Sequence, residues 1–217
     1  ELNGKVELRY NREDFKDFNN KVVFDVNFDK AHISTNDLNY FYNEFGKDNL
    51  LYVDTHLLGT LNDFTTKNLT LNDSNGSEII GTANFKNLFS KKENEYAISG
   101  NFDRISSNYD GIVKLMPKVL GERLPNELAR LGKFELNGAM DLTYEDIDAD
   151  IEITSKLGYL KSDIYIDKLY DIDRASYNGN IILNKFDLGT LIDDKIVGKA
   201  TLNLDVNGKG FTQKYLD

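Results

Sequence analysis

Residues 134–153 read FELNGAMDLTYEDIDADIEI, and this stretch decides the fold. Apolar and polar residues alternate along it, which is the two-residue period of a β-strand with one apolar and one solvated face. The alternation extends over residues 132–183 and predicts four strands that are separated by short polar or glycine-containing turns. Such a run of short consecutive strands is typical of an antiparallel meander.

Alternation of the same kind recurs through most of the chain. The strongest example is Val22, Phe24, Val26 and Phe28, which alternate mostly with polar or acidic residues. The sequence therefore predicts a mainly β fold, and we expect residues 1–217 to form a single unit, a segment of a longer chain. Further strands are predicted at residues 2–10, 51–58, 69–71, 78–85, 96–102 and 200–206.

Two segments have a helical period instead. Residues 36–46 begin with a possible cap at Thr35 or Asn36 and end at Gly46, so they predict a short helix. Residues 109–131 carry apolar side chains at spacings of three and four, with breaks expected at Pro117 and near Pro125. These helices either plug one end of the sheet or form a movable flap or partner contact.

Short units repeat along the chain. The pattern ELNGxxELxY at residues 1–10 returns as ELNGxxDLxY at residues 135–144. A weaker copy of residues 131–137 occurs at residues 197–203. We therefore expect the sheet to be built from a repeated unit.

Composition excludes several classes of function. The formal net charge is −10 and the basic residues do not cluster, which argues against a nucleic-acid partner. Cysteine is absent, which fits a reducing cytoplasm and a bacterial periplasm equally well. The sequence has neither a leader pattern nor an apolar run long enough for a membrane helix. We therefore expect the chain to be a segment cut from a longer protein.

No motif predicts catalysis. The two histidines, His32 and His56, have no metal-ligand spacing, and phosphate-binding, dinucleotide-binding and nucleophile-elbow patterns are missing. Asp146, Asp148 and Asp150 resemble a calcium-binding spacing, but their alternation with apolar residues favours the solvated side of a strand. The sequence predicts a protein that is not an enzyme and has no metal or cofactor.

Several pieces of the chain together resemble the AsmA-like proteins of bacterial envelopes, and among them the TamB (translocation and assembly module) family. The resemblance rests on residues 38–45 (LNYFYNEF), 58–64 (LGTLNDF), 68–71 (NLTL), 115–117 (LMP), 131–132 (LG), 137–138 (NG), 177–179 (YNG), 186–191 (FDLGTL) and 197–198 (VG). These pieces are short and span nearly the whole chain.

The resemblance implies a long periplasmic protein that is anchored in the inner membrane and whose strands curl into an open groove, called a β-taco or repeating β-groove. It also implies a role in phospholipid transfer between the inner and outer membranes, and in outer-membrane assembly and protein secretion with a TamA-type barrel partner. Phospholipid acyl chains are then the expected ligand.

A curled row of strands with one apolar face is wide enough to hold hydrocarbon. Its expected lining residues are Val22, Phe24, Val26, Phe28, Leu136, Met140, Leu142, Ile151, Ile153, Ile164, Ile166, Ile181, Leu183, Leu202 and Leu204.

The sequence is also consistent with three other interpretations of the fold and function. The apolar strand faces could instead close on one another in a sandwich or barrel with a dry core. The domain could be an interaction scaffold that binds client protein strands along a sheet edge. A sugar-binding sandwich would need exposed aromatic platforms, for which Tyr159, Tyr165 and Tyr170 are the candidates.

Overall fold

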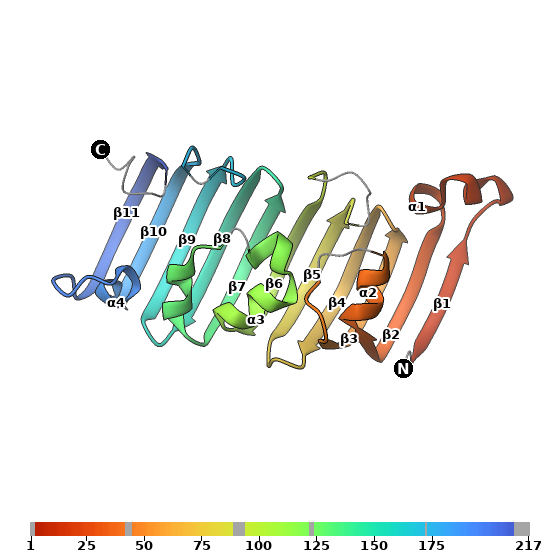
Figure 1. Cartoon of the computed structure of the whole chain (residues 1–217), viewed down its shortest axis with the longest axis horizontal. Helices are drawn as coiled ribbons and strands as arrows, with labels where there is room; N and C mark the ends of the chain where they lie inside the picture. The colour runs from red at the N-terminus through yellow and green to blue at the C-terminus, as the bar shows by residue number, and fades with distance from the viewer. Residues whose placement is uncertain (1–2, 42–44, 89–93, 122–123, 172, 211–217) are drawn as a thin grey trace.

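The strands form one antiparallel sheet in which spatial order follows chain order (Figure 1). The computed structural model describes residues 3–41, 45–88, 94–121, 124–171 and 173–210. Within these residues the sheet has 11 strands, and the antiparallel meander is confirmed. The strands are β1 (Gly4–Arg9), β2 (Val23–Ser34), β3 (Leu50–Thr60), β4 (Asp63–Asp73), β5 (Glu78–Lys86), β6 (Ala97–Ser107), β7 (Phe134–Thr143), β8 (Asp146–Ser155), β9 (Gly158–Asp167), β10 (Ser176–Asp187) and β11 (Lys199–Lys209).

Short helices lie in four of the strand connections. Residues 109–131 form three helical pieces, and the breaks at Pro117 and Pro125 are where the sequence places them. The predicted helix at 36–46 begins earlier, at Thr35; residues 42–44 lie outside the described residues, and Phe45 is not helical. The helical elements are η1 (Arg12–Asp17), α1 (Phe18–Lys21), α2 (Thr35–Phe41), α3 (Tyr109–Leu115), η2 (Pro117–Gly121), η3 (Asn126–Leu131) and α4 (Leu188–Ile192).

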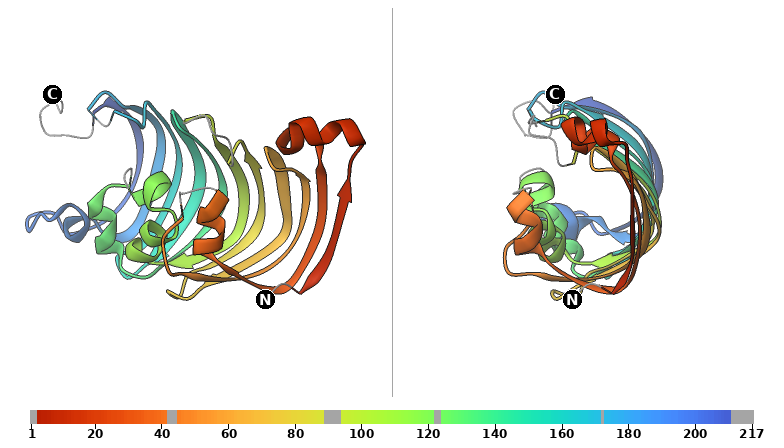
Figure 2. Two further views of the ribbon diagram at one scale, coloured as in Figure 1. Left: turned by 45° about the vertical axis from the view of Figure 1, so that its right-hand side comes forward. Right: turned by 90° about the vertical axis from the view of Figure 1, so that its right-hand side faces the viewer.

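The sheet is strongly curled but stays open. Viewed end-on, the strands trace a C, and α2, α3 and η3 lie at its open side (Figure 2). The first and last strands, β1 and β11, do not pair with each other. The alternative of a closed sandwich or barrel is therefore wrong for this chain. None of the helices in the described ranges has the length and hydropathy needed to cross a bilayer.

The apolar side chains face the inside of the curl. Ladder partners place Leu142 beside Ile147 and Ile147 beside Ile166, so one apolar row crosses β7, β8 and β9. On the same face, Leu115 and Met116 from the α3 region belong to one buried cluster with Leu51 of β3. The helices lie at the side to which the C opens (Figure 2), so the apolar face that packs with them is the concave one.

Bulges interrupt the alternation in the middle of several strands. In β2 the ladder shifts between Phe28 and Ala31, where Lys30 has a left-handed φ of 50°. Asn68 in β4 and Lys185 in β10 have φ values of 52° and 49° at the corresponding shifts. A bulge adds one residue to one strand, bends it and increases its twist. These bulges contribute to the curvature of the sheet.

Glycines add to the curvature. Gly138 in β7 and Gly179 in β10 have φ values of 129° and 151°, which L side chains rarely adopt. A Cβ at either position would lie 2.2 Å or 2.1 Å from a carbonyl oxygen of the neighbouring strand. Both glycines belong to the Asn-Gly pairs that repeat in the sequence, so the repeat marks positions where the strand must bend.

The core consists of clusters spaced along the concave face. The first joins β3 and β4 to the α3 region through Leu51, Leu69 and Leu115. The second centres on Phe102 and Leu136, and the third on Leu131, Leu183 and Phe186. Each cluster combines strand residues with at least one helical residue, so the helices at the open side complete the core.

Candidate functional site: the concave apolar face

A row of mostly small residues crosses the middle of the concave face. Thr66 of β4 pairs with Ala83, and Ala83 pairs with Gly100. Gly100 pairs with Met140, which in turn pairs with Ala149. The row then continues through Ile164 to Gly179. Side chains crowd one another on the inside of a tight curl, and small residues relieve this crowding. At Gly100 the ring of Phe102 occupies the space that a Cβ would take.

Ladder register places the predicted lining residues other than Val22 on this face, although Val26, Leu136, Leu142 and Leu183 are buried there. Val22 precedes β2, caps the end of α1 and is completely buried, so it does not line an open surface. The prediction is wrong for Val22 because the chain turns from helix to strand at this point. Ladder register places the other residues on the concave face: Phe24, Val26, Phe28, Leu136, Met140, Leu142, Ile151, Ile153, Ile164, Ile166, Ile181, Leu183, Leu202 and Leu204.

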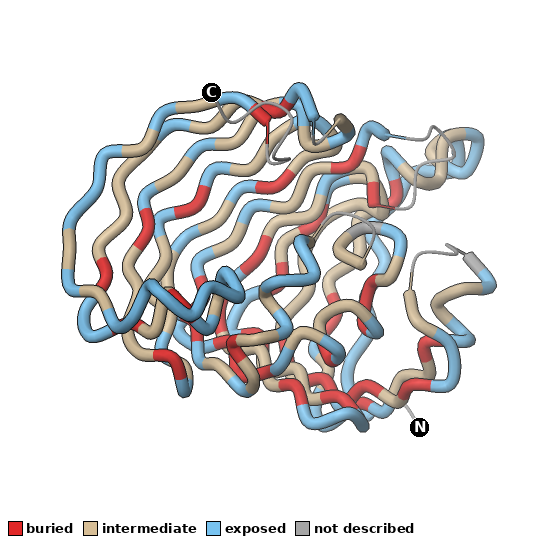
Figure 3. The backbone as a smooth tube through the Cα atoms, turned by 60° about the vertical axis from the view of Figure 1, so that its left-hand side comes forward, coloured by how far each residue is buried: buried red, intermediate tan, exposed pale blue. Residues whose placement is uncertain are grey.

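Helices cover part of this face. Leu183 is 4 % exposed and packs with Leu131 of η3 and with Phe186. Leu136 and Leu142 are also buried, in two other clusters. These positions belong to the packed core, so, like Val22, they do not line an open surface. Figure 3 shows how buried, half-buried and exposed positions follow one another along the strands.

The face is least covered at its two ends. At one end Val6 is 61 % exposed and Leu8 is 43 % exposed; at the other, Leu204 is 43 % exposed. Their ladder partners Val26 and Ile181 place Val6 and Leu204 on the concave side. Sequence alternation could have identified Val6 and Leu8, but the prediction placed the lining only from β2 onward.

Next to β1, aromatic rings extend the apolar surface. The ring centroids of Tyr10 and Phe15 lie 4.7 Å apart in an edge-to-face arrangement, and those of Phe15 and Phe18 lie 6.1 Å apart. Phe18 in turn contacts Phe24 of the concave face at 5.8 Å. Tyr10 and Phe15 are each about half exposed. The connection through η1 and α1, which the sequence did not predict, supplies this surface.

The convex face is polar and acidic. Asp148 and Asp150 of β8 are exposed on it, as the alternation predicts. Asp148 is directly opposite Asp141, and Asp150 is opposite Asp163. Among the described residues no group of His, Asp or Glu side chains is arranged to hold a metal ion.

Both histidines contact neighbours on strands. The Nε2 atom of His56 lies 2.7 Å from Oδ1 of Asp25, and Arg9 donates to the other oxygen of the same carboxylate. The hydrogen bond from His56, followed by the charge of Arg9, lowers the pKa of Asp25. The ring of His32 packs edge to face on Tyr52. These contacts link neighbouring strands and include no nucleophile.

The candidate aromatic platforms do not meet. Tyr159 and Tyr165 are six positions apart on β9, which is about 20 Å along a strand. The hydroxyl of Tyr165 donates a hydrogen bond to Asp146. Desolvation of this hydroxyl, followed by the negative charge of Asp146, raises the pKa of Tyr165. Tyr170 lies beyond the strand and stacks on Tyr144 at 5.7 Å. The structure therefore does not bring the three tyrosines together.

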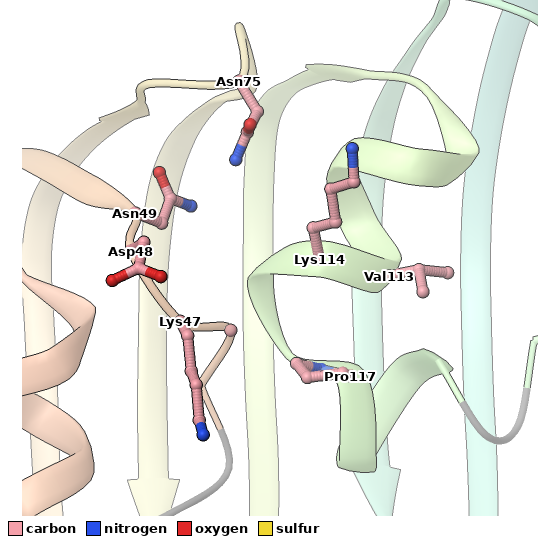
Figure 4. A pocket seen from close by; sticks show the side chains of 8 residues that line it. Lys47, Asp48, Asn49, Asn75, Val113, Lys114 and Pro117 are labelled. Carbon is pink, nitrogen blue, oxygen red and sulfur yellow. The ribbon is translucent and has the colours of Figure 1, made fainter.

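A small cavity of about 240 Å³, lined by both polar and apolar residues, lies beside α3 (Figure 4). It is bordered by the loop before β3, by Asn75 of the β4–β5 turn and by α3. The side chains of Lys47 and Lys114 point toward opposite ends of it, so their ammonium groups do not converge (Figure 4).

Beneath this cavity, buried polar groups hold the helix to the strand ends. Asn49 donates to Asp73 at 3.2 Å, and Asp73 accepts from the Ser77 backbone at 2.7 Å. The hydroxyls of Ser77 and Ser107 lie 2.8 Å apart. Asn108 caps α3 by accepting from Gly111 N at 2.9 Å. This network positions the helix that covers the concave face.

Comparison with protein-family models, curated proteins and solved structures finds no match to this chain. The class of protein that the fold defines is an open, curled antiparallel meander with an apolar concave face.

Proposed function

We propose that the concave face binds the acyl chains of phospholipids and that the protein is a non-enzymatic lipid carrier or conduit. The observation that carries the proposal is the continuity of the apolar face. It crosses the strands of an open sheet, is covered at the buried positions Leu136, Leu142 and Leu183, and is exposed at Val6 and Leu204. Large exposed apolar surfaces on a folded protein mark sites of interaction with apolar partners.

The energetics are sufficient for such a ligand. Transfer of one methylene from water to an apolar surface is worth about 0.8 kcal/mol, so an acyl chain of roughly sixteen carbons gains on the order of 10 kcal/mol before ordering costs. The polar head group can stay in solvent at the open side of the curl. This agrees with the lack of a convergent polar site on the concave face among the described residues.

The resemblance to AsmA-like proteins supports the same proposal. It adds a location in the periplasm, in a protein anchored in the inner membrane, and transfer of phospholipid between the two membranes. A TamA-type barrel would then be the partner in outer-membrane assembly. These extensions rest on the resemblance alone.

The test compares two doubly substituted proteins that gain the same charge on opposite faces. Ile164→Asp with Leu204→Asp places two carboxylates on the concave face, one at a half-buried position outside the three core clusters and one at an exposed position. Asn178→Asp with Asn203→Asp places them at exposed positions on the convex face of neighbouring strands. Phospholipid bound by each purified protein is measured by native mass spectrometry after incubation with phosphatidylethanolamine vesicles.

We expect the concave variant to lose bound lipid and the convex variant to keep the wild-type amount. Circular dichroism must show that both remain folded, because Ile164 is half-buried and a carboxylate at that position is partly desolvated. Equal lipid binding by all three proteins, or no lipid on the wild-type chain, contradicts the proposal.

A second candidate function is the binding of a client protein strand. A client strand would pair with a sheet edge, and within the described residues β1 and β11 each pair with one neighbour only. Capture of extended peptides by the wild-type protein, unaffected by the concave substitutions, is the result that distinguishes this function from lipid binding.

A further inference from the structure

One of the five Asn-Gly pairs in the chain lies in a turn between two strands. Asn75 and Gly76 connect β4 to β5, and both residues are exposed. The same dipeptide therefore occurs in two different backbone settings, because the other pairs lie at the start of a strand or within one. These are Asn3-Gly4 at the start of β1, Asn137-Gly138 in β7, Asn178-Gly179 in β10 and Asn207-Gly208 in β11.

This dipeptide has a chemistry of its own. The backbone nitrogen of the residue after an asparagine can attack Cγ of the asparagine side chain. A bond forms between that nitrogen and Cγ, and the side-chain amide leaves as ammonia together with the proton of the attacking N–H, so that a cyclic imide results. Water then opens the imide at either carbonyl and gives aspartate or isoaspartate. Glycine after the asparagine has no side chain to obstruct the attack.

The turn leaves the reacting groups of Asn75 and Gly76 accessible. A Cβ on Gly76, whose φ is 86°, would meet no atom within 4 Å, so the space beside the attacking nitrogen is open. The N–H of Gly76 donates to the carbonyl of Asp73 at 3.3 Å, which is long for a hydrogen bond of this type. The side chain of Asn75 extends from the turn and borders the cavity beside α3 (Figure 4). The nitrogen and Cγ can therefore approach each other without breaking a strand ladder.

The pairs in the middle of the sheet are held differently. Asn137-Gly138 and Asn178-Gly179 lie in strands that pair with a neighbour on each side. A backbone rotation that brings the glycine nitrogen onto Cγ of the asparagine breaks ladder hydrogen bonds there. Such a break requires local opening of the sheet, and local opening costs most in the core strands of a protein. We therefore expect these two pairs to react slowly while the protein is folded.

The reacting peptide bond in the turn lies between two donors to one buried carboxylate. The backbone N–H groups of Asn75 and Ser77 both donate to Oδ1 of Asp73, at 2.9 Å and 2.7 Å. The hydroxyl of Ser77 lies 2.8 Å from that of Ser107, and a Cβ on Gly111 would lie 2.7 Å from both hydroxyl oxygens. The first turn of α3 therefore rests directly on the two serines, and the turn fixes the position of one of them.

We propose that Asn75 is a site of spontaneous deamidation in the folded protein and that its isoaspartyl product loosens the attachment of α3 to the strand ends. In isoaspartate the main chain runs through Cβ and Cγ, which adds a backbone atom between the N–H groups of residues 75 and 77. These groups then no longer fit the same oxygen of Asp73, and Ser77 shifts under α3. The reaction does not depend on lipid binding and is tested without lipid.

Ageing of the folded wild-type chain tests the site. The protein is incubated in a mildly alkaline buffer, which favours the deprotonated attacking nitrogen, and is then digested and mapped by tandem mass spectrometry. We expect Asn75 to deamidate roughly tenfold faster or more than Asn137 and Asn178, because the two strand sites first need local opening of the ladder. In urea the three rates should become similar, since the dipeptide is the same at each site.

Asn75→Gln is the matched control at the same position. Its side chain is one methylene longer, so closure of the corresponding ring is much slower, and the peptide that spans the β4–β5 turn should keep its mass during ageing. Equal rates at Asn75 and Asn137 in the folded protein, or reaction of Asn75 in urea alone, overturn the proposal. A mass gain of this peptide that is as fast in Asn75→Gln as in the wild type does the same.

Hydrogen exchange tests the effect on α3. Amides of residues 109–115 should exchange faster in aged wild-type protein than in equally aged Asn75→Gln, whereas exchange in β9 should be the same in both. Asn75→Asp gains the charge of the product without the extra backbone atom, so its fresh protein should exchange like fresh wild type in α3. Unchanged exchange in α3 after ageing contradicts the loosening, and faster exchange in fresh Asn75→Asp contradicts its assignment to the lengthened backbone.

Discussion

Gly138 illustrates how one residue sets the shape of the sheet. It occupies the interior of β7, where glycine has no propensity advantage, and its φ of 129° lies in a region that costs other residues on the order of 1–3 kcal/mol. The neighbouring carbonyl of Asp150 occupies the position where a side chain would begin. The bend and the close approach of β8 therefore depend on the missing Cβ.

Gly138→Ala should lower the free energy of unfolding by about 2–3 kcal/mol or more, because strain in φ adds to the clash with β8. Urea denaturation of the purified variant measures this. Gly198→Ala is the control: a Cβ there meets no atom within 4 Å, and its effect should be near zero or slightly stabilising. Equal effects of the two substitutions contradict the role assigned to Gly138.

Single residues also explain where sequence reasoning stops. The predicted strand ending at Phe28 continues to Ser34, and the one ending at Phe102 continues to Ser107, because each crosses a bulge. A bulge shifts the two-residue period, so the alternation before it is out of phase with the alternation after it. The strand predicted at 69–71 is the part of β4 that follows its bulge, and the strand predicted to end at Leu183 continues past its bulge to Asp187.

At the scale of elements, one carboxylate connects the first three strands. Asp25 of β2 accepts from Arg9 of β1 and contacts His56 of β3 at 2.7 Å, all on the convex face. Its pKa is lowered, first by the hydrogen bond with His56 and then by the charge of Arg9. The folded protein therefore holds this carboxylate ionised to lower pH than the unfolded chain does.

A group with a lowered folded pKa contributes stability that is present above its unfolded pKa, near 3.9, and is lost as the pH falls through its folded pKa. Asp25→Asn should therefore reduce the urea midpoint at pH 7 while weakening the dependence of that midpoint on pH below about 4. Asp54→Asn, on the convex face of β3, is the control for the general effect of removing a carboxylate. Parallel pH profiles for wild type and Asp25→Asn would show that this contact does not contribute.

The helical elements were predictable only in part. Three- and four-residue spacing and the two prolines predicted the pieces of residues 109–131, because amphipathic period and proline geometry are local properties. The segments η1, α1 and α4 are too short to show a period. Which part of the apolar face the helices cover depends on tertiary contacts such as Leu131 with Leu183, and spacing along the sequence does not contain them.

At the scale of the whole molecule, each strand contacts mainly its neighbours, as in repeat proteins. The buried clusters follow one another along the sheet, and the third, around Phe186, involves the C-terminal strands. Phe186→Ala removes a fully buried ring, and such truncations cost about 3–5 kcal/mol. We expect the destabilisation to stay close to this cluster.

Hydrogen exchange followed by mass spectrometry can locate the effect. Phe186→Ala should speed amide exchange in β9, β10 and β11 and leave exchange in β3 and β4 close to that of the wild type. Val53→Ala, a truncation in the first cluster, should give the opposite distribution. A uniform increase across all strands in either variant would mean that the sheet opens as one cooperative unit.

The order of strands in space has a consequence for biosynthesis. Because each of the strands β2 to β11 hydrogen-bonds to the strand before it in the chain, none of them has to wait for a distant segment, and the entropy cost of closing each connection grows only slowly with its length. The sheet can grow strand by strand in chain order as the polypeptide emerges, with each new strand pairing with the one before it. A ribosome-bound nascent chain that ends after β5 should accordingly already contain paired strands.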